Sequence, residues 1–372
     1  MVKLSEVKTL NAALAAETRR PLVAVFLGGT SGIGHMTARA LASSAQQAGG
    51  DAPPRIYLVG RSEQRGGEIV EELRGLCPAG KYRFVRAADL SLMACVDAVC
   101  AEITRLEEEE EGQEPRIDYL MTSQGEPSFS LVKVYTTEGL DETMAILYYS
   151  RMRAIQQLMP LLLKSTLPAT VVSVFAAGFE VERKLFREDL SLRDLQRYSY
   201  TQARSHLCYM HSMYMSKLAE IHAGQLRLIH IFPGLVLTPA FHNPTYPAWF
   251  RFLFNRVLAP LFLAPFVAVN PVESGQRMLS LASPVLYPAT ATPGAGNDNS
   301  RGNESGKGGT VKGMDGRPGS GAYSLDWKGD DAHNRKVYAK LGDDGVESLK
   351  KQVWEHTNKA FEVIASGKPF TE

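Results

Sequence analysis

The chain has 372 residues, of which 44% are hydrophobic and 22% charged, a balance typical of a globular protein with a large buried core. Its 41 lysine and arginine residues are offset by 40 aspartate and glutamate residues, which leaves a formal net charge of +1. A charge so near zero creates no overall field that attracts a polyanion, so nucleic acid is not an expected partner.

The cysteines lie far apart, with no Cys-x-x-Cys pair and no group of histidines beside them. They are Cys77, Cys95, Cys100 and Cys208. This spacing matches neither a disulfide framework nor a metal site. The first ten residues are charged and lack the apolar core of a signal peptide. We therefore expect reduced thiols, no metal and a cytoplasmic location.

Residues 1–20 are expected to form a helix ahead of the main domain, which covers residues 21–291. The apolar run 23–27 predicts a strand buried on both faces, and a glycine-rich turn follows it directly. Its glycines allow a close approach to a pyrophosphate, and the next helix begins with unpaired N–H groups. A turn without a ligand also favours glycine. Together with the elements downstream, the pattern predicts a dinucleotide-binding loop made by Gly28, Thr30, Ser31, Gly32, Ile33 and Gly34.

Short apolar segments and helix-like segments alternate along the rest of the main domain. Strands are expected at 55–59, 81–85, 117–121, 169–175 and 226–231, and helices at 63–76, 94–106, 140–164 and 198–222. Such alternation predicts an α/β fold, in which a parallel sheet of about seven strands is covered by helices on both faces.

The end of the second strand indicates which dinucleotide fits. An acidic residue there would bind a ribose 2′-hydroxyl, whereas an arginine accommodates a 2′-phosphate. The chain has Gly60-Arg61-Ser62, so we predict NADP, with Arg61 and Ser62 as contacts to the phosphate. An ordinary surface arginine is the alternative for Arg61. Asp89, after the third strand, is expected near the adenine, and an aspartate that caps the next helix is its alternative.

The segment 240–270 is rich in aromatic and apolar residues. Part of it, 246–269, is long enough to span a membrane, but Arg251, Arg256 and three prolines interrupt it. We expect a lid over a pocket for a bulky apolar substrate. Attachment to a membrane surface and plain core packing stay open as alternatives.

Composition changes abruptly after the main domain. Residues 292–321 are rich in glycine, asparagine, serine and lysine with almost nothing apolar, which predicts a disordered insertion. Residues 322–372 are expected to hold the last strand, at 322–327, and a C-terminal helix that docks on the core.

Five motifs together resemble the short-chain dehydrogenase/reductase family. They are the glycine turn, Gly60-Arg61, Asp89-Leu90, Tyr198-Ser-Tyr-Thr-Gln202-Ala203 and Pro233-Gly234-Leu-Val-Leu-Thr238. The resemblance covers about residues 20–330 and implies a Rossmann-like doubly wound sheet. Residues 2–6, 148–153 and 322–329 further resemble a fungal branch whose members often accompany polyketide or terpenoid pathways. This implies an NADP-dependent enzyme that reduces a carbonyl of a bulky apolar intermediate.

The catalytic residues depart from the family pattern at several places. Asn-Asn-Ala-Gly after the fourth strand is replaced by Thr-Ser-Gln-Gly at 122–125. The helix asparagine of the family falls on Leu147, and its serine falls near Ala176 or Ala177. Neither serine position carries a hydroxyl.

In the family's Tyr-x-x-x-Lys motif, the tyrosine corresponds to Tyr198 and the lysine to Gln202. We choose this alignment because the surrounding Tyr-Ser-x-Thr-x-Ala matches the family, and we predict Tyr198 as the proton donor. Two other alignments pair Met213 with Lys217, or Arg204 with Cys208.

The loss of the lysine has a chemical consequence. Gln202 can bond the nicotinamide ribose but cannot supply the positive charge that lowers the pKa of the tyrosine, so reduction is favoured over alcohol oxidation. His206, two helical turns after Tyr198, is a substitute acid only if it faces the cleft. A packed core histidine is the favoured interpretation.

Pro233 and Thr238 complete the predicted coenzyme site, with Thr238 at the family position that bonds the nicotinamide carboxamide. A plain turn with a helix-capping threonine is the alternative. Because the serine and lysine are missing, two further hypotheses stay open: a cyclase, isomerase or dehydratase of the same fold, and a catalytically silent nucleotide-binding protein. A homodimer is compatible with the sequence, which does not decide the oligomeric state.

Overall fold

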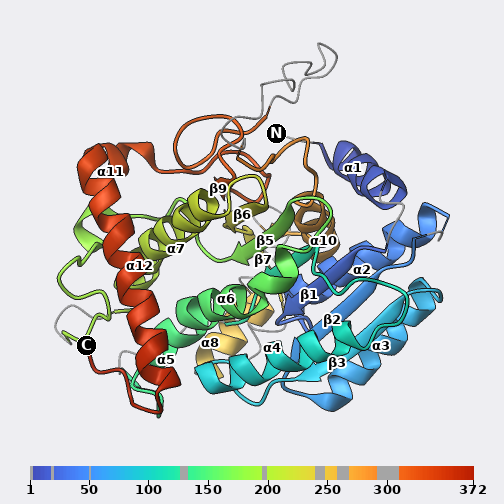
Figure 1. Ribbon diagram of the computed structural model, residues 1–372, viewed down its shortest axis with the longest axis horizontal. Coiled ribbons are helices and arrows are strands. Elements are labelled where there is room, and N and C mark those ends of the chain that lie inside the picture. Colours follow the sequence, from blue (N-terminus) through green and yellow to red (C-terminus); the bar gives the residue numbers. More distant parts are fainter. Residues whose placement is uncertain are drawn as a thin grey trace.

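A computed structural model describes residues 3–17, 21–49, 52–125, 133–194, 199–238, 248–257, 268–290 and 310–372. The central feature is a seven-stranded sheet in the order β3-β2-β1-β4-β5-β6-β9, in which all neighbours are parallel (Figure 1). The strands are β1 (Val23–Leu27), β2 (Arg55–Gly60), β3 (Lys81–Arg86), β4 (Tyr119–Thr122), β5 (Ala169–Val174), β6 (Leu226–Ile231) and β9 (Ala322–Leu325). This confirms the predicted doubly wound parallel sheet.

Helices cover both faces of the sheet. One layer contains α4 (Met93–Glu108), α6 (Ser150–Leu162) and α7 (Tyr200–Ile221), with α12 (Asp343–Ala365) packed outside it. A short helix α5 (Glu142–Met144) and a π-helical turn (Ala145–Tyr149) lead into α6. The opposite layer contains α1 (Leu4–Glu17), α2 (Gly32–Gln47), α3 (Glu63–Leu76) and α10 (Pro271–Ser280). Shorter elements are β7 (Leu235–Val236), β8 (Ala268–Val269), α8 (Ala248–Leu253), α11 (Arg335–Ala339) and a 3-10 turn (Glu182–Lys184).

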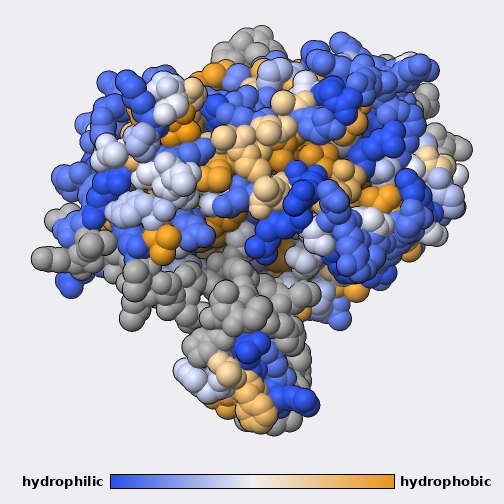
Figure 2. All heavy atoms as spheres, turned by 90° about the horizontal axis from the view of Figure 1, so that it is seen from below, coloured by the Kyte–Doolittle hydropathy of each residue, from blue (hydrophilic) through white to orange (hydrophobic). Residues whose placement is uncertain are grey.

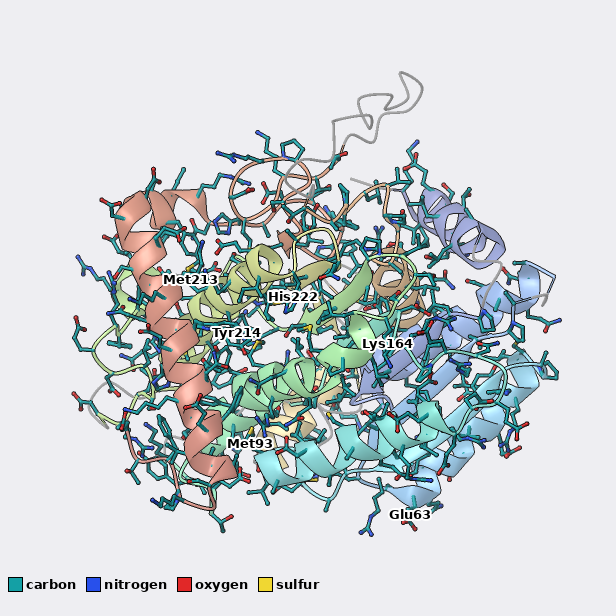
Figure 3. The ribbon with its side chains drawn as sticks, viewed as in Figure 1. Glu63, Met93, Lys164, Met213, Tyr214 and His222 are labelled. Atoms are coloured by element: carbon teal, nitrogen blue, oxygen red, sulfur yellow. The ribbon has the colours of Figure 1, made fainter. Side chains whose placement is uncertain are left out.

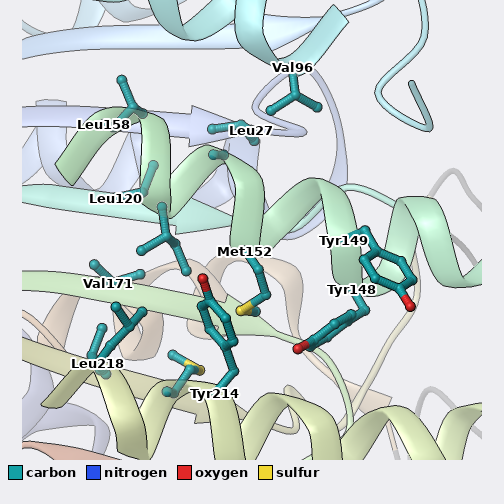
Figure 4. Close-up of a cluster of buried hydrophobic side chains, with 14 of the residues drawn as sticks. Leu27, Val96, Leu120, Tyr148, Tyr149, Met152, Leu158, Val171, Tyr214 and Leu218 are labelled. Atoms are coloured by element: carbon teal, nitrogen blue, oxygen red, sulfur yellow. The ribbon is translucent and has the colours of Figure 1, made fainter. Parts of the chain in front are cut away.

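The layer of α6 and α7 encloses the larger apolar cluster. Figure 4 shows Leu120 and Val171 of the sheet facing Met152 of α6 and Tyr214 of α7. The ring of Tyr214 also stacks on Trp354 of α12, with 4.9 Å between centroids, and Figure 3 shows Tyr214 beside that helix. The C-terminal helix therefore docks on the core, as its apolar face predicts.

The strand order changes direction at β1: β2 and β3 follow on one side of it, and β4, β5 and β6 follow on the other. β1 pairs with β2 on one side and with β4 on the other, so the chain turns to opposite helical layers after these strands. Parallel α/β sheets bind ligands in the crevice outside the carboxyl ends of the strands at such a point. The glycine turn after β1 lies there.

The predicted disordered insertion 292–321 is wrong at its C-terminal end. Residues 310–321 form a turn in which Gly313 N donates to Arg317 O at 2.9 Å and Met314 N donates to Ala322 O at 2.9 Å. Met314 is buried against the core, a long-range contact that glycine-rich composition conceals. Residues 292–309 lie outside the described residues.

Most of the predicted lid, 240–270, also lies outside the described residues. Its described part includes α8, where Trp249 and Phe252 are each 68% exposed. Figure 2 shows hydrophobic and hydrophilic residues side by side on the face seen from below. Within the described ranges, no helix combines the length and the apolar character that a membrane span requires.

Candidate active site

The turn between β1 and α2 is packed tightly against the ends of two neighbouring strands. Gly28 has a φ of +85°, and its N–H donates to Val59 O at 3.1 Å. A Cβ on Gly28 would lie 2.8 Å from Gln124 N, after β4, and a Cβ on Gly34 would lie 2.7 Å from Gly28 O. Only glycine fits both positions, because any side chain there would push the turn away from the sheet.

The other predicted residues of the turn line the start of α2. Thr30 lies over the end of β2, where a Cβ on Gly60 would collide with its side chain. Ser31 is the exposed N-cap residue of α2, and its hydroxyl accepts no capping hydrogen bond within the described structure. Ile33 packs against the apolar cluster beneath the helix. The first N–H groups of α2 are thus left for an anionic ligand.

The loop after β6 closes over the same turn. Pro233 is half-buried, and Gly234 has a φ of +75° with Val269 and Trp327 packed against it. Thr238, at the end of this loop, lies beside Gly32: its Cγ2 is 3.1 Å from the position of a Cβ on Gly32. The fold therefore joins two motifs that are distant in sequence.

Of the three residues predicted at the adenosine end, two have local structural roles. Ser62 caps α3, because its Oγ accepts from Arg65 N at 3.2 Å. Asp89 Oδ1 accepts from Ser91 N at 2.8 Å and from Ser91 Oγ at 2.7 Å. Arg61 is exposed and has no hydrogen bond or ion pair among the described residues, so its guanidinium is free to meet a ligand.

The predicted proton donor, Tyr198, lies outside the described residues, which resume at Ser199. Ser199 caps α7: its Oγ accepts from Gln202 N at 3.2 Å and lies 2.9 Å from Gln202 Oε1. The side chain of Gln202 is thus held by the cap at the start of the helix.

Three residues of α7 share one helical face, since Tyr200, Arg204 and Cys208 follow one another at intervals of four. Cys208 Sγ donates to Ala176 O at 2.9 Å, which places this face at the end of β5. Arg204 and Cys208, which one alternative alignment places at the tyrosine and lysine positions, thus lie on the face of α7 that packs at the end of β5. The same face carries a pattern that is readable in the sequence, because a tyrosine, Tyr200, stands four residues before an arginine.

Tyr200, in the first turn of α7, is half-buried, and the charges of two guanidinium groups act on its phenol. Burial raises its pKa, while Arg204 and Arg151 act in the opposite direction. The net effect is a raised pKa, so the phenol carries its proton at neutral pH and is suited to donate it rather than to act as a base.

Arg151 of α6 forms hydrogen bonds with residues at the carboxyl ends of both β4 and β5. Its side chain donates to Ser173 Oγ at 3.1 Å, to Val174 O at 2.7 Å and to Gln124 O at 2.5 Å. The residue is 1% exposed and has no carboxylate partner within the described part of the chain. Burial lowers its pKa to about 9. Nothing in the local sequence pattern around residue 151 marks a buried arginine, so the sequence alone did not point to this residue.

Two other predicted alternatives are excluded by packing. His206 is a core histidine: its Nδ1 accepts from Phe186 N at 3.3 Å and its Nε2 lies 3.1 Å from Leu190 O. Burial lowers its pKa to about 4. Met213 is buried in the core and Lys217 pairs with Glu220 at 3.1 Å on the helix surface, so these residues are no catalytic pair.

Comparison with known proteins identifies the family. No family model matches the sequence. The chain is 37% identical over 359 residues to oxidoreductase AN1596 of Emericella nidulans, covering 96% of this chain and 97% of the relative. It is 33% identical over 346 residues to the short-chain dehydrogenase/reductase SAT2 of Stachybotrys chartarum, covering 92% and 93%. The chain belongs to the short-chain dehydrogenase/reductase family. This short-chain dehydrogenase/reductase also shares its fold with RhlG of Pseudomonas aeruginosa, with a TM-score of 0.50 and 21% identity over 71% of this chain and 90% of RhlG.

Proposed function

We propose that the protein is an NADP-dependent oxidoreductase that reduces a carbonyl of a bulky apolar intermediate in fungal secondary metabolism. The observation that carries the proposal is the closed glycine turn, in which Gly28 packs on Gln124 and Gly32 packs on Thr238. It is supported by the relatives named as oxidoreductases and by the solved complex of RhlG with NADP.

The residues present fit a dinucleotide. The turn and the uncapped start of α2 suit the diphosphate, and we assign the hydroxyl of Thr238, which lies beside Gly32, to the nicotinamide carboxamide. Arg61, exposed and without a carboxylate partner among the described residues, suits a 2′-phosphate. NADPH, when bound, supplies the hydride. The protein's own part is to orient the carbonyl and to deliver a proton to its oxygen.

We infer that the phenol of Tyr198 or of Tyr200 delivers that proton. Tyr198 is the residue predicted from the sequence, and Tyr200 is a described phenol in the first turn of α7, on which the charges of Arg204 and Arg151 act. With alanine at both candidate positions of the family's serine, Ala176 and Ala177, no hydroxyl from those positions reaches the carbonyl oxygen, so the proton from the phenol neutralises the developing charge.

A fluorescence titration with NADPH and with NADH tests the coenzyme. We expect NADPH to bind more tightly, and Arg61→Ala to remove most of that preference. Arg74→Ala is the matched control, because Arg74 is an exposed arginine of α3 that pairs with Glu71. Equal affinity of the unsubstituted protein for both coenzymes would contradict the assignment of Arg61.

A second measurement separates reduction from the other chemistries of this fold. NADPH consumption is followed with a panel of aromatic polyketide and terpenoid ketones, and the products are analysed with and without coenzyme. We expect products only with NADPH. Conversion that continues after the coenzyme is removed would instead support a cyclase, isomerase or dehydratase.

A further inference from the structure

Arg204 presents a guanidinium at the mouth of the proposed site. Its Cζ lies 4.1 Å from the centroid of the Phe179 ring, and Phe179 packs edge-on against Phe232 with 4.7 Å between centroids. Phe179 is 40% exposed. These residues follow β5 and β6, so the cation and its aromatic support stand where parallel sheets bind ligands.

No carboxylate among the described residues pairs with the guanidinium of Arg204. It has no ion pair within the described residues, whereas Glu182 nearby pairs with Lys340. Glu180 is buried and accepts from Ser212 Oγ at 3.3 Å and from Tyr338 Oη at 3.2 Å. Burial raises the pKa of Glu180, which disfavours its charged form. Arg151 adds a second guanidinium without a carboxylate partner in the described structure.

An arginine held over an aromatic ring by a cation–π contact uses the face of its guanidinium and keeps N–H donors for a ligand. A planar carboxylate can accept two parallel hydrogen bonds from that edge. The diphosphate and 2′-phosphate of the coenzyme have their own sites at the glycine turn and at Arg61, so Arg204 is available to the substrate.

From this arrangement we propose that the substrate is an apolar oxo acid whose carboxylate is bound by Arg204, with Phe179 and Phe232 against its apolar part. The inference rests on the proposed function, because it names the substrate class of the same site. It predicts that the enzyme distinguishes a carboxylic acid from its neutral ester, even when both carry the same carbonyl.

The test is calorimetric binding of paired probes. Aryl and alkyl oxo acids, 4-benzoylbutyrate among them, are each compared with their methyl esters, with and without NADP+. We expect at least one acid to bind more tightly than its ester, and Arg204→Gln to weaken that acid about 10- to 100-fold with little change for the ester. Arg204→Lys should retain part of the affinity, and Lys217→Gln, on the same helix, should retain all of it.

The inference is overturned if no acid of the panel binds more tightly than its ester, or if Arg204→Gln weakens acid and ester equally. If Arg204→Gln weakens NADP+ as strongly as Arg61→Ala does, the guanidinium serves the coenzyme and the inference also fails. Failure of the proposed function has a different signature, since the chain would then bind no coenzyme while the comparison of acid with ester still gives its answer.

Discussion

The methyl group of Thr238 lies against the backbone of Gly32, with 3.1 Å between Thr238 Cγ2 and the position that a Cβ on Gly32 would take. Gly32 also has a φ of +54°, a conformation that costs a residue with a side chain about 1–2 kcal/mol. The glycine turn and the loop after β6 are therefore matched in shape, and each supports the position of the other.

Gly32→Ala should both destabilise the protein and weaken coenzyme binding, because the new methyl group would displace Thr238 or the turn. We expect a lower melting temperature and about a tenfold or greater loss of NADPH affinity, measured by thermal unfolding and fluorescence titration. Gly67→Ala is the control, since a Cβ on Gly67 of α3 would meet no atom within 4 Å. Equal effects of both substitutions would contradict the fit described above.

Replacing Tyr198 and Tyr200 should identify the proton donor. Tyr198→Phe and Tyr200→Phe are compared with the double variant in assays of NADPH-dependent reduction. One single variant is expected to lose about 100-fold or more in kcat, as is typical for the loss of a general acid, while NADPH affinity is retained. If the double variant keeps most of its activity, neither phenol donates the proton.

Arg151→Met should destabilise the protein strongly. The substitution removes the donors to Ser173 Oγ, Val174 O and Gln124 O, and buried acceptors left without a donor cost about 1–3 kcal/mol each. We expect the free energy of unfolding in urea to fall by about 3 kcal/mol or more, with partial recovery in Arg151→Lys. Arg105→Met is the surface control, because Arg105 pairs with Glu102 and Glu109 in the open on α4. A loss no larger than that of the control would show that Arg151 is dispensable.

Stability should decline as the pH falls below about 6.5, where histidines of the unfolded chain take up protons. Burial lowers the pKa of His206, of His356 and of His333 to about 4, and that of His230 to about 3. Because these histidines stay neutral in the folded protein, their contribution is complete above pH 6.5 and is lost progressively toward pH 4. Each contributes at most about 1.4 kcal/mol per pH unit in that window.

Unfolding free energies at pH 7.5, 6.0 and 5.0 measure this slope. His206→Gln should make the decline shallower, although it also lowers the stability at pH 7.5 by disturbing the contacts to Phe186 and Leu190. An unchanged slope would mean that His206 is accessible to protons in the folded state.

The sequence by itself determined the parallel sheet, the helices on both faces and the position of the glycine turn. These features depend on local periodicity and on residue types such as Gly28, whose backbone conformation few other residues adopt. It also placed alanine at both candidate positions of the family's serine and Gln202 at the lysine position of the chosen alignment, since these are matters of residue identity.

Only the tertiary structure decided which side chains meet. Contacts between distant segments decide which face of α7 meets β5 through Cys208 and where the guanidinium of Arg151 finds its acceptors. The structure also shows that Asp89 bonds Ser91. Burial of Met314 orders a stretch whose composition alone predicted disorder. The physical reason is the same in each case: local sequence sets the periodicity of an element, whereas the packing of elements sets its rotation, its neighbours and the charge around each group.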